Sequence, residues 1–192
     1  MITDYKKIKG WFDYENVYDT VLEYLSVKLK RKLRVVEIGA WLGKSSFYLV
    51  QQHCDKADIY IIDTWKGSPG ELHSTHSLAT ERDIYLDFIE NMKIHHGKFT
   101  AIRSMSVDAA KLFQDLSVDF IFIDGDHTYE GVKSDIEAWQ IKLTEFGVIA
   151  GHDYVIGWDG VRKAVNEKFG IRNIRVMGRS WIFGLPKINN TA

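Results

Sequence analysis

Segments typical of buried β-strands alternate with segments typical of amphipathic helices along most of this chain. The strand-like segments are short and rich in Val, Ile and Phe, and they lie at 34–38, 58–63, 99–103, 118–123 and 147–150. The helix-like segments repeat apolar residues every three or four positions, at 15–30, 45–53, 81–92, 109–113, 132–143 and 160–169. This alternation favours parallel strands joined by right-handed crossovers, with helices on both faces of the sheet. The sequence therefore predicts a doubly wound α/β fold.

The two ends of the chain and one long loop depart from this alternation. Segments 174–177 and 181–184 flank a short polar turn, a spacing typical of an antiparallel hairpin. The length of 192 residues suits a single domain over 1–192. We expect residues 1–14 to form an arm that packs on a second copy in a homo-oligomer. Because long polar loops in compact domains tend to carry function, we expect 64–80 to be a lid or substrate loop.

Charge and cysteine content narrow the class of protein. Lys and Arg total 25 against 26 Asp and Glu, so no basic excess points to nucleic acid. The single cysteine, Cys54, excludes an internal disulfide and any CxxC zinc or redox pattern. The first ten residues lack the apolar core of a signal peptide, and no apolar run approaches the length of a membrane helix. We expect a cytoplasmic protein that binds neither nucleic acid nor a membrane.

A first group of polar and glycine residues follows the first two strand-like segments. Gly39 and Gly43 form GxxxG rather than the GxGxxG of dinucleotide sites, and Glu37 beside them suits a cationic ligand better than a phosphate. Asp63 ends the second strand 24 residues after Gly39, where an acid can accept hydrogen bonds from ribose hydroxyls. Trp65 would cover an adenine face. Together these residues indicate a positively charged nucleoside, a description that S-adenosylmethionine fits.

A second group follows the fourth and fifth strand-like segments. It contains Asp124, Asp126 and His127 after one strand and His152 and Asp153 after the next. Adjacent parallel strands end about 5 Å apart, so these side chains can converge on a divalent cation such as Mg²⁺. We expect Asp124, His152 and Asp153 as metal ligands. Either His127 or His152 would be the general base, with Asp124 also catalytic.

Simpler structural explanations exist for most of these residues taken singly. The glycines suit an ordinary strand-to-helix turn, Asp63 a backbone cap and Trp65 core packing. Asp126 and His127 suit a helix cap. The remaining histidines on polar stretches are expected to be exposed: His53, His95 and His96.

The run 35–43 resembles the first motif of class I S-adenosylmethionine-dependent methyltransferases. The run 122–132, with Asp135, Trp139 and 151–154, resembles the macrocin-type O-methyltransferases (methyltransferase domain 24-like), and the likeness extends over residues 34–167. This resemblance implies a Rossmann-like domain with a mostly parallel seven-stranded sheet. Its strand order would be 3-2-1-4-5-7-6, with the last strand antiparallel.

The resemblance also bears on the cofactor and the metal. Metal-dependent relatives carry an Asp at the position of Asp124 and an Asp-Asp pair where this chain has His152-Asp153. The histidine leaves open whether this residue ligates a metal, acts as base or does neither. The residues expected at S-adenosylmethionine are Glu37, Gly39, Ala40, Trp41, Gly43, Asp63, Thr64, Trp65, Ser104 and Asp124.

We therefore expect an enzyme that methylates a hydroxyl on a sugar or another small natural-product acceptor, with S-adenosylmethionine and with a divalent metal as candidate assistant. Three other classes stay open. A nicotinamide-dependent oxidoreductase is favoured by Asp63 and disfavoured by the missing GxGxxG. A metal-dependent hydrolase would use the Asp and His cluster alone. The last is a non-catalytic protein that only binds the cofactor.

Overall fold

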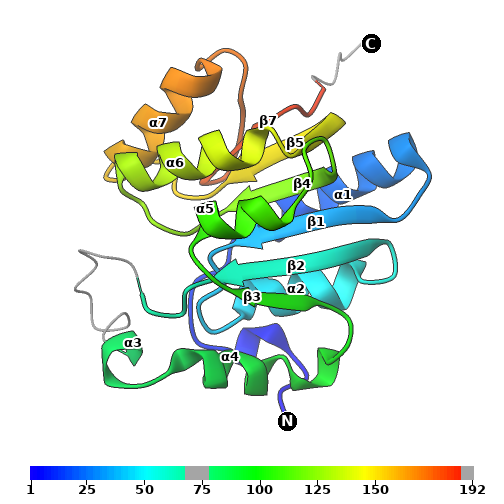
Figure 1. The fold of residues 1–192 in the computed structure, drawn as a ribbon, viewed down its shortest axis with the longest axis vertical. Helices are drawn as coiled ribbons and strands as arrows, with labels where there is room; N and C mark the ends of the chain where they lie inside the picture. Colours follow the sequence, from blue (N-terminus) through cyan, green and yellow to red (C-terminus); the bar gives the residue numbers. More distant parts are fainter. Residues whose placement is uncertain (68–77, 187–192) are drawn as a thin grey trace.

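A single twisted sheet organises the molecule (Figure 1). The structure, a computed structural model, describes residues 1–67 and 78–186. The strand order β3-β2-β1-β4-β5-β7-β6 confirms the order expected from the resemblance. β7 runs antiparallel to β5 and β6, while the other neighbours pair in parallel. The strands are β1 (Leu33–Ile38), β2 (Ala57–Asp63), β3 (Thr100–Arg103), β4 (Val118–Ile123), β5 (Leu143–Gly151), β6 (Arg175–Met177) and β7 (Ser180–Phe183).

Helices cover both faces of the sheet, because successive residues of the buried strands point to opposite sides. Val35 belongs to the apolar core under α1, α2 and α4, whereas Val36 belongs to the core under α5, α6 and α7. Figure 1 shows these two helical layers. Within the described part of the chain, no helix combines the length and apolar character needed to cross a membrane. The helices are α1 (Glu15–Leu29), α2 (Lys44–His53), α3 (Leu78–Glu81), α4 (Ile84–Asn91), α5 (Ser106–Ala109), α6 (Tyr129–Gln140) and α7 (Asp159–Phe169), with short 3-10 turns η1 (Tyr5–Lys7), η2 (Lys93–His95) and η3 (Ala110–Leu112).

Two segments differ from the predicted boundaries. Leu143 opens β5 instead of ending the preceding helix, because it pairs with Val118 across a register shift in β4. The helix predicted over 81–92 is divided into α3 and α4. The division falls at Asp83, whose carboxylate accepts the Tyr85 N–H and caps α4.

Two histidines expected at the surface are buried. His53 is 9% exposed, and its Nε2 lies 3.0 Å from Asp19 Oδ1. His95 is 5% exposed and packs edge-on against Phe47. The polar sequences around them did not indicate this, because burial here comes from neighbouring helices. His96 is exposed as expected.

The N-terminal segment packs on its own domain, and its expected contact with a second copy stays a prediction. Ile8 and Tyr14 are each 2% exposed. Lys44 on α2 donates through Nζ to the Gly10 carbonyl at 3.0 Å. The segment then passes the carboxyl ends of the central strands before α1 begins (Figure 1). Of the predicted lid over 64–80, residues 68–77 lie outside the described residues.

Candidate functional site

The glycine turn after β1 holds the central strands close together. Gly39 has φ +87°, and a Cβ built there would lie 2.0 Å from the Asp124 carbonyl oxygen at the end of β4. Gly43 has φ +89° and begins α2, and a Cβ there would lie 2.9 Å from the Phe88 ring. Both positions thus require glycine for backbone conformation and packing. The turn explanation accounts for the glycine pair without a ligand.

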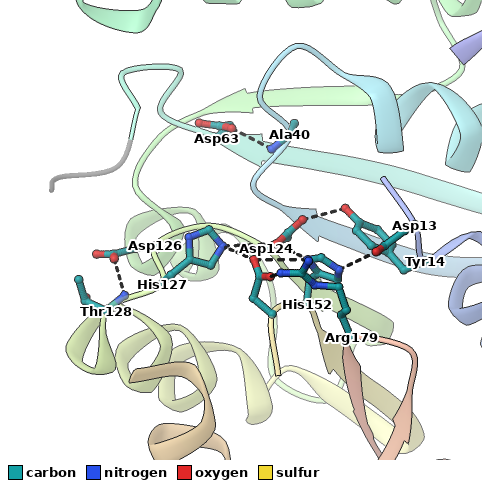
Figure 2. A network of polar contacts seen from close by, with 11 residues as sticks. Asp13, Tyr14, Ala40, Asp63, Asp124, Asp126, His127, Thr128, His152 and Arg179 are labelled. Atoms are coloured by element: carbon teal, nitrogen blue, oxygen red, sulfur yellow. Dashed lines mark hydrogen bonds and ion pairs between the residues drawn. The ribbon is translucent and has the colours of Figure 1, made fainter. Parts of the chain in front are cut away.

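Asp63 binds that turn from the end of β2. Its Oδ2 accepts the Ala40 N–H at 2.8 Å (Figure 2) and the Trp41 N–H at 2.9 Å, and its Oδ1 accepts the Trp65 N–H at 2.7 Å. The carboxylate therefore acts as a backbone cap, as the simpler explanation had it. Because an ionised carboxylate offers about four acceptor positions, Asp63 retains capacity for one more donor, such as a ribose hydroxyl.

The other residues expected at the cofactor differ in exposure. Trp65 is 1% exposed, and its indole N–H donates to the Trp41 carbonyl at 2.9 Å. It belongs to the core, a position that does not support its predicted role over an adenine. Thr64 and Ser104 are half-buried beside the ends of β2 and β3. The Ser104 N–H donates to the Asp63 carbonyl, which keeps these two strand ends together.

Glu37 lies beneath the turn with no exposed surface. The Tyr18 hydroxyl donates to Oε1 at 2.8 Å, and the Ser46 hydroxyl donates to Oε2. Burial raises the pKa of Glu37 to about 7, although hydrogen bonds from Ser46, Ser45 and Tyr18 oppose the rise. Because Glu37 has no exposed surface in this structure, its predicted contact with a cationic group stays a prediction.

Four titratable side chains converge at the ends of β4 and β5 (Figure 2). His127 Nε2 lies 3.1 Å from Asp153 Oδ2 and 3.6 Å from Asp124 Oδ1. His152 Nδ1 lies 3.4 Å from that same Asp153 oxygen and 3.7 Å from the Asp124 oxygen. The structure thus brings together Asp124, His127, His152 and Asp153 as the sequence predicted. We call Asp124 Oδ1, His152 Nδ1 and Asp153 Oδ2 the inner atoms.

The opposite atom of each of these three residues is held by a further side chain. Tyr14 donates its hydroxyl to Asp124 Oδ2 at 2.9 Å. Arg179 donates to Asp153 Oδ1 at 2.7 Å. Asp13 Oδ1 lies 2.8 Å from His152 Nε2. Figure 2 shows the three partners approaching from outside the cluster. These contacts leave the inner atoms turned toward one another.

Opposite charges stabilise one another in this cluster. Burial favours a higher pKa for Asp153, but the close contacts with His127 and His152 and their charges outweigh it and hold that pKa well below its usual value. Burial likewise favours a lower pKa for His152. The contact with Asp153 and the charges of Asp124, Asp153 and Asp13 outweigh it and raise that pKa. The cluster therefore keeps the Asp153 carboxylate ionised and favours positive charge beside it.

The donor set fits a divalent cation. One ligand atom each from Asp124, His152 and Asp153 lies within 4.8 Å of the other two. Two carboxylate oxygens suit Mg²⁺ or Mn²⁺, and the imidazole nitrogen shifts the preference toward Mn²⁺ and other transition metals. A cavity of about 10 Å³ beside Asp124, His127 and His152 has space for about one water molecule.

Asp126 and His127 lie in the loop from β4 to α6, and the structure gives them different contacts. Asp126 accepts the Thr128 N–H at 2.8 Å, and Thr128 accepts the Gly131 N–H at the start of α6. Asp126 is therefore a capping residue, as its simpler explanation had it. His127 instead packs its ring 4.5 Å from Trp158 and points its Nε2 into the cluster.

Sequence reasoning missed the three outer partners, Asp13, Tyr14 and Arg179. Asp13 and Tyr14 precede α1 and are 139 and 110 positions away from the residues they contact. Arg179 sits in the turn between β6 and β7. No spacing pattern links such distant residues. The one local signal was the polar turn of the predicted hairpin.

Residues 36–154 match the model of the family described as "Methyltransferase domain" (Methyltransf_24), a span of more than half the chain. The "Uncharacterized protein y4gI" of Sinorhizobium fredii is 30% identical over 126 residues. That alignment covers 64% of this chain and 13% of the relative, so the chain corresponds to a small part of that protein's length.

Solved structures share the fold. The TDP-rhamnose 3′-O-methyltransferase CalS11, an enzyme of calicheamicin biosynthesis, superimposes with a TM-score of 0.60 at 14% identity, over 88% of this chain and 77% of its own. The S-adenosylhomocysteine-bound methyltransferase PaMTH1 of Podospora anserina gives 0.57 at 15% identity, over 92% and 89%. At these identities the likeness establishes the fold.

Proposed function

Because this chain belongs to the methyltransferase-domain family, we propose that it transfers the methyl group of S-adenosylmethionine to a hydroxyl of a sugar or related natural-product acceptor. The observation that carries the proposal is the convergence of Asp124, His127, His152 and Asp153 beside the glycine turn of β1. CalS11, which shares the fold, is a sugar O-methyltransferase, and this supports the acceptor class.

The cofactor would lie over the turn after β1. Ligands in open α/β sheets bind beyond the carboxyl ends of the strands, and Gly39, Ala40, Trp41, Asp63 and Ser104 meet there. Asp63 has one acceptor position left for a ribose hydroxyl. When bound, S-adenosylmethionine supplies a methyl group already activated by its sulfonium. The chain's own contribution is to align the acceptor and remove its proton.

A divalent cation would be held by the inner atoms of Asp124, His152 and Asp153. Such a cation lowers the pKa of an acceptor hydroxyl and orients it. The support for this part of the proposal is that Tyr14, Asp13 and Arg179 each hold one ligand from outside, with its remaining donor atom facing inward. Second partners of this kind are typical of metal sites in proteins.

We assign the general base to His127. Both nitrogens of His152 are engaged, because Nε2 contacts Asp13 and Nδ1 faces the inner oxygen of Asp153. The His127 side chain is 17% exposed against 8% for His152, so His127 is the more accessible imidazole of the two. The Asp153 carboxylate at 3.1 Å would stabilise the imidazolium that forms when His127 takes the proton.

Family membership also bears on the alternatives. The matched family is one of methyltransferases, so neither a nicotinamide-dependent oxidoreductase nor a metal-dependent hydrolase is favoured. The GxxxG turn, packed against Asp124 and Phe88, gives no observation in favour of a dinucleotide.

Two measurements test the proposal. Isothermal titration with S-adenosylhomocysteine should show saturable binding, and the absence of binding would contradict the cofactor assignment. Labelled S-adenosylmethionine with a panel of nucleotide-activated sugars should then yield a methylated product identified by mass spectrometry. Asp124→Asn should abolish transfer. The matched control is Asp126→Asn, two residues along the same loop, which should transfer normally because Asp126 caps the backbone.

A further inference from the structure

The N-terminal segment supplies two of the three outer contacts of the cluster. Asp13 reaches His152 after β5, and the adjacent Tyr14 reaches Asp124 after β4. Tyr14 is buried at 2% exposure and stacks on Phe122 of β4, with ring centroids 4.5 Å apart. Asp13 is thereby fixed beside a ring that is itself only 8% exposed.

The distances around His152 decide which ring nitrogen carries the hydrogen of the neutral imidazole. Nε2 lies 2.8 Å from Asp13 Oδ1, a full hydrogen bond. Nδ1 lies 3.4 and 3.7 Å from the Asp153 and Asp124 oxygens, which is too far for a strong one. The hydrogen therefore belongs on Nε2, and the lone pair of Nδ1 faces two carboxylate oxygens.

The lone pair of a ring nitrogen repels the carboxylate oxygens that it faces unless a positive charge lies between them. The three inner atoms are spaced for a cation, as shown above. Metal-ligating histidines commonly donate their other ring N–H to a carboxylate, which fixes the tautomer and the ring orientation. Asp13 is the carboxylate that receives the outer ring N–H of His152.

We propose that Asp13 is a positioning residue that holds His152 with Nε2–H turned outward and Nδ1 turned to the cation, so that the docked N-terminal segment completes the site. This inference rests on the proposed function, because it takes the inner atoms to be a cation site. A neutral imidazole offers a ring nitrogen as ligand only in one of its two tautomers, so His152 needs a partner that fixes the tautomer.

The chain contains a matched histidine–aspartate pair for comparison. His53 at the end of α2 has its Nε2 3.0 Å from Asp19 Oδ1, almost the same contact. That pair lies toward the amino ends of the strands, because α2 begins beside their carboxyl ends and runs away from them. Removing Asp19 therefore removes the same type of contact without touching the site.

The test measures Mn²⁺ affinity by electron paramagnetic resonance titration of the full chain and four variants. Asp13→Ala should weaken binding about tenfold or more, in the range found for second partners of metal ligands. Asp13→Asn, whose amide oxygen can still accept the Nε2 hydrogen, should lose only about fivefold. His152→Ala should abolish binding. Asp19→Ala should bind as the unaltered protein does.

A second readout needs neither metal nor activity. Long-range ¹H–¹⁵N spectra of the metal-free protein should place the hydrogen of neutral His152 on Nε2, and Asp13→Ala should move it to Nδ1. A hydrogen on Nδ1 in the unaltered protein overturns the inference. So does Mn²⁺ binding that His152→Ala abolishes and Asp13→Ala leaves unchanged, and in that case the proposed function stands. If the unaltered protein binds no Mn²⁺, the cation site fails, and this inference fails with it.

Discussion

Acidic side chains end strands in two regions of the sheet, and the two regions use them in opposite ways. At the ends of β1 and β2, both acids accept hydrogen bonds from the protein itself. Glu37 accepts the hydroxyls of Tyr18 and Ser46, and Asp63 accepts three backbone N–H groups. At the ends of β4 and β5, the carboxylates are held from outside and face each other across two histidines.

The difference separates structural acids from acids suited to a ligand. A carboxylate that accepts several backbone N–H groups stabilises the turn, and its loss should reduce stability. Converging carboxylates repel one another and need a cation. Their arrangement therefore adds little to the free energy of unfolding and much to the affinity for a cation. Substitutions in the first region should therefore act on stability, and those in the second on activity and cation affinity.

The largest effect is expected in the second region. His127→Ala should lower kcat about 100-fold to 10,000-fold, the usual range for a general base. The melting temperature should change little. Steady-state methyl transfer checks the first point and thermal denaturation the second. His96→Ala, an exposed histidine outside the site, is the control. Retained activity in His127→Ala would remove its role as base.

Glu37 in the first region should give a pH-dependent stability. Its pKa is raised from 4.5 to about 7 in the folded protein, so the folded state holds this proton more tightly than the unfolded chain. The contribution of Glu37 to the free energy of unfolding is therefore greatest below pH 4.5 and falls as the pH rises through about 7. The fall corresponds to about 3 kcal/mol for this shift.

Replacing Glu37 by Gln removes that titration. Urea denaturation across this pH window should show the Glu37→Gln variant gaining stability relative to the unaltered protein as the pH rises. A difference between the two proteins that stays constant with pH would contradict the burial argument.

Asp63→Ala should cost about 2 kcal/mol of unfolding free energy, because three backbone N–H groups lose their acceptor. Asp58→Ala on the same strand removes an ion pair with Lys32 in which both side chains are more than half exposed. That control should cost less than about 1 kcal/mol. Equal stability of the two variants in urea would argue against a structural role for Asp63.

The smallest predicted effect separates two tyrosines at the start of α1. Tyr14→Phe removes the hydroxyl that holds Asp124, and it should weaken Mn²⁺ binding roughly fivefold, about 1 kcal/mol. Tyr18→Phe removes the hydroxyl that donates to Glu37, and Mn²⁺ affinity should not change. Equal losses of affinity in the two variants would contradict the separation between the Glu37 region and the cluster at β4 and β5.

Much of the fold followed from the sequence, because strand and helix periodicities are local. The strand order came from the family resemblance. The cluster at β4 and β5 was predictable as well, since neighbouring parallel strands bring Asp124, His127, His152 and Asp153 to one edge. The signal was that Asp124, His152 and Asp153 follow their strands within two positions and that His127 lies four positions after β4.

Other features depend on contacts that local patterns do not encode. Asp13 and Tyr14 meet the cluster from the other end of the chain. Trp65 follows a strand-end acid, as a ligand-covering aromatic would, yet Tyr85 and Phe88 enclose its ring in the core. His95 lies in a polar stretch, and its burial is set by Phe47 on another helix. In each case tertiary packing decided the outcome.

Electron–nuclear double resonance of the Mn²⁺-loaded protein would show directly whether the ends of β4 and β5 form a cation site. We expect bound Mn²⁺ with a directly coordinated imidazole nitrogen, and we expect His152→Ala to eliminate that nitrogen signal. Bound Mn²⁺ that shows no nitrogen coupling, or a coupling that survives in His152→Ala, would contradict the proposed cation site.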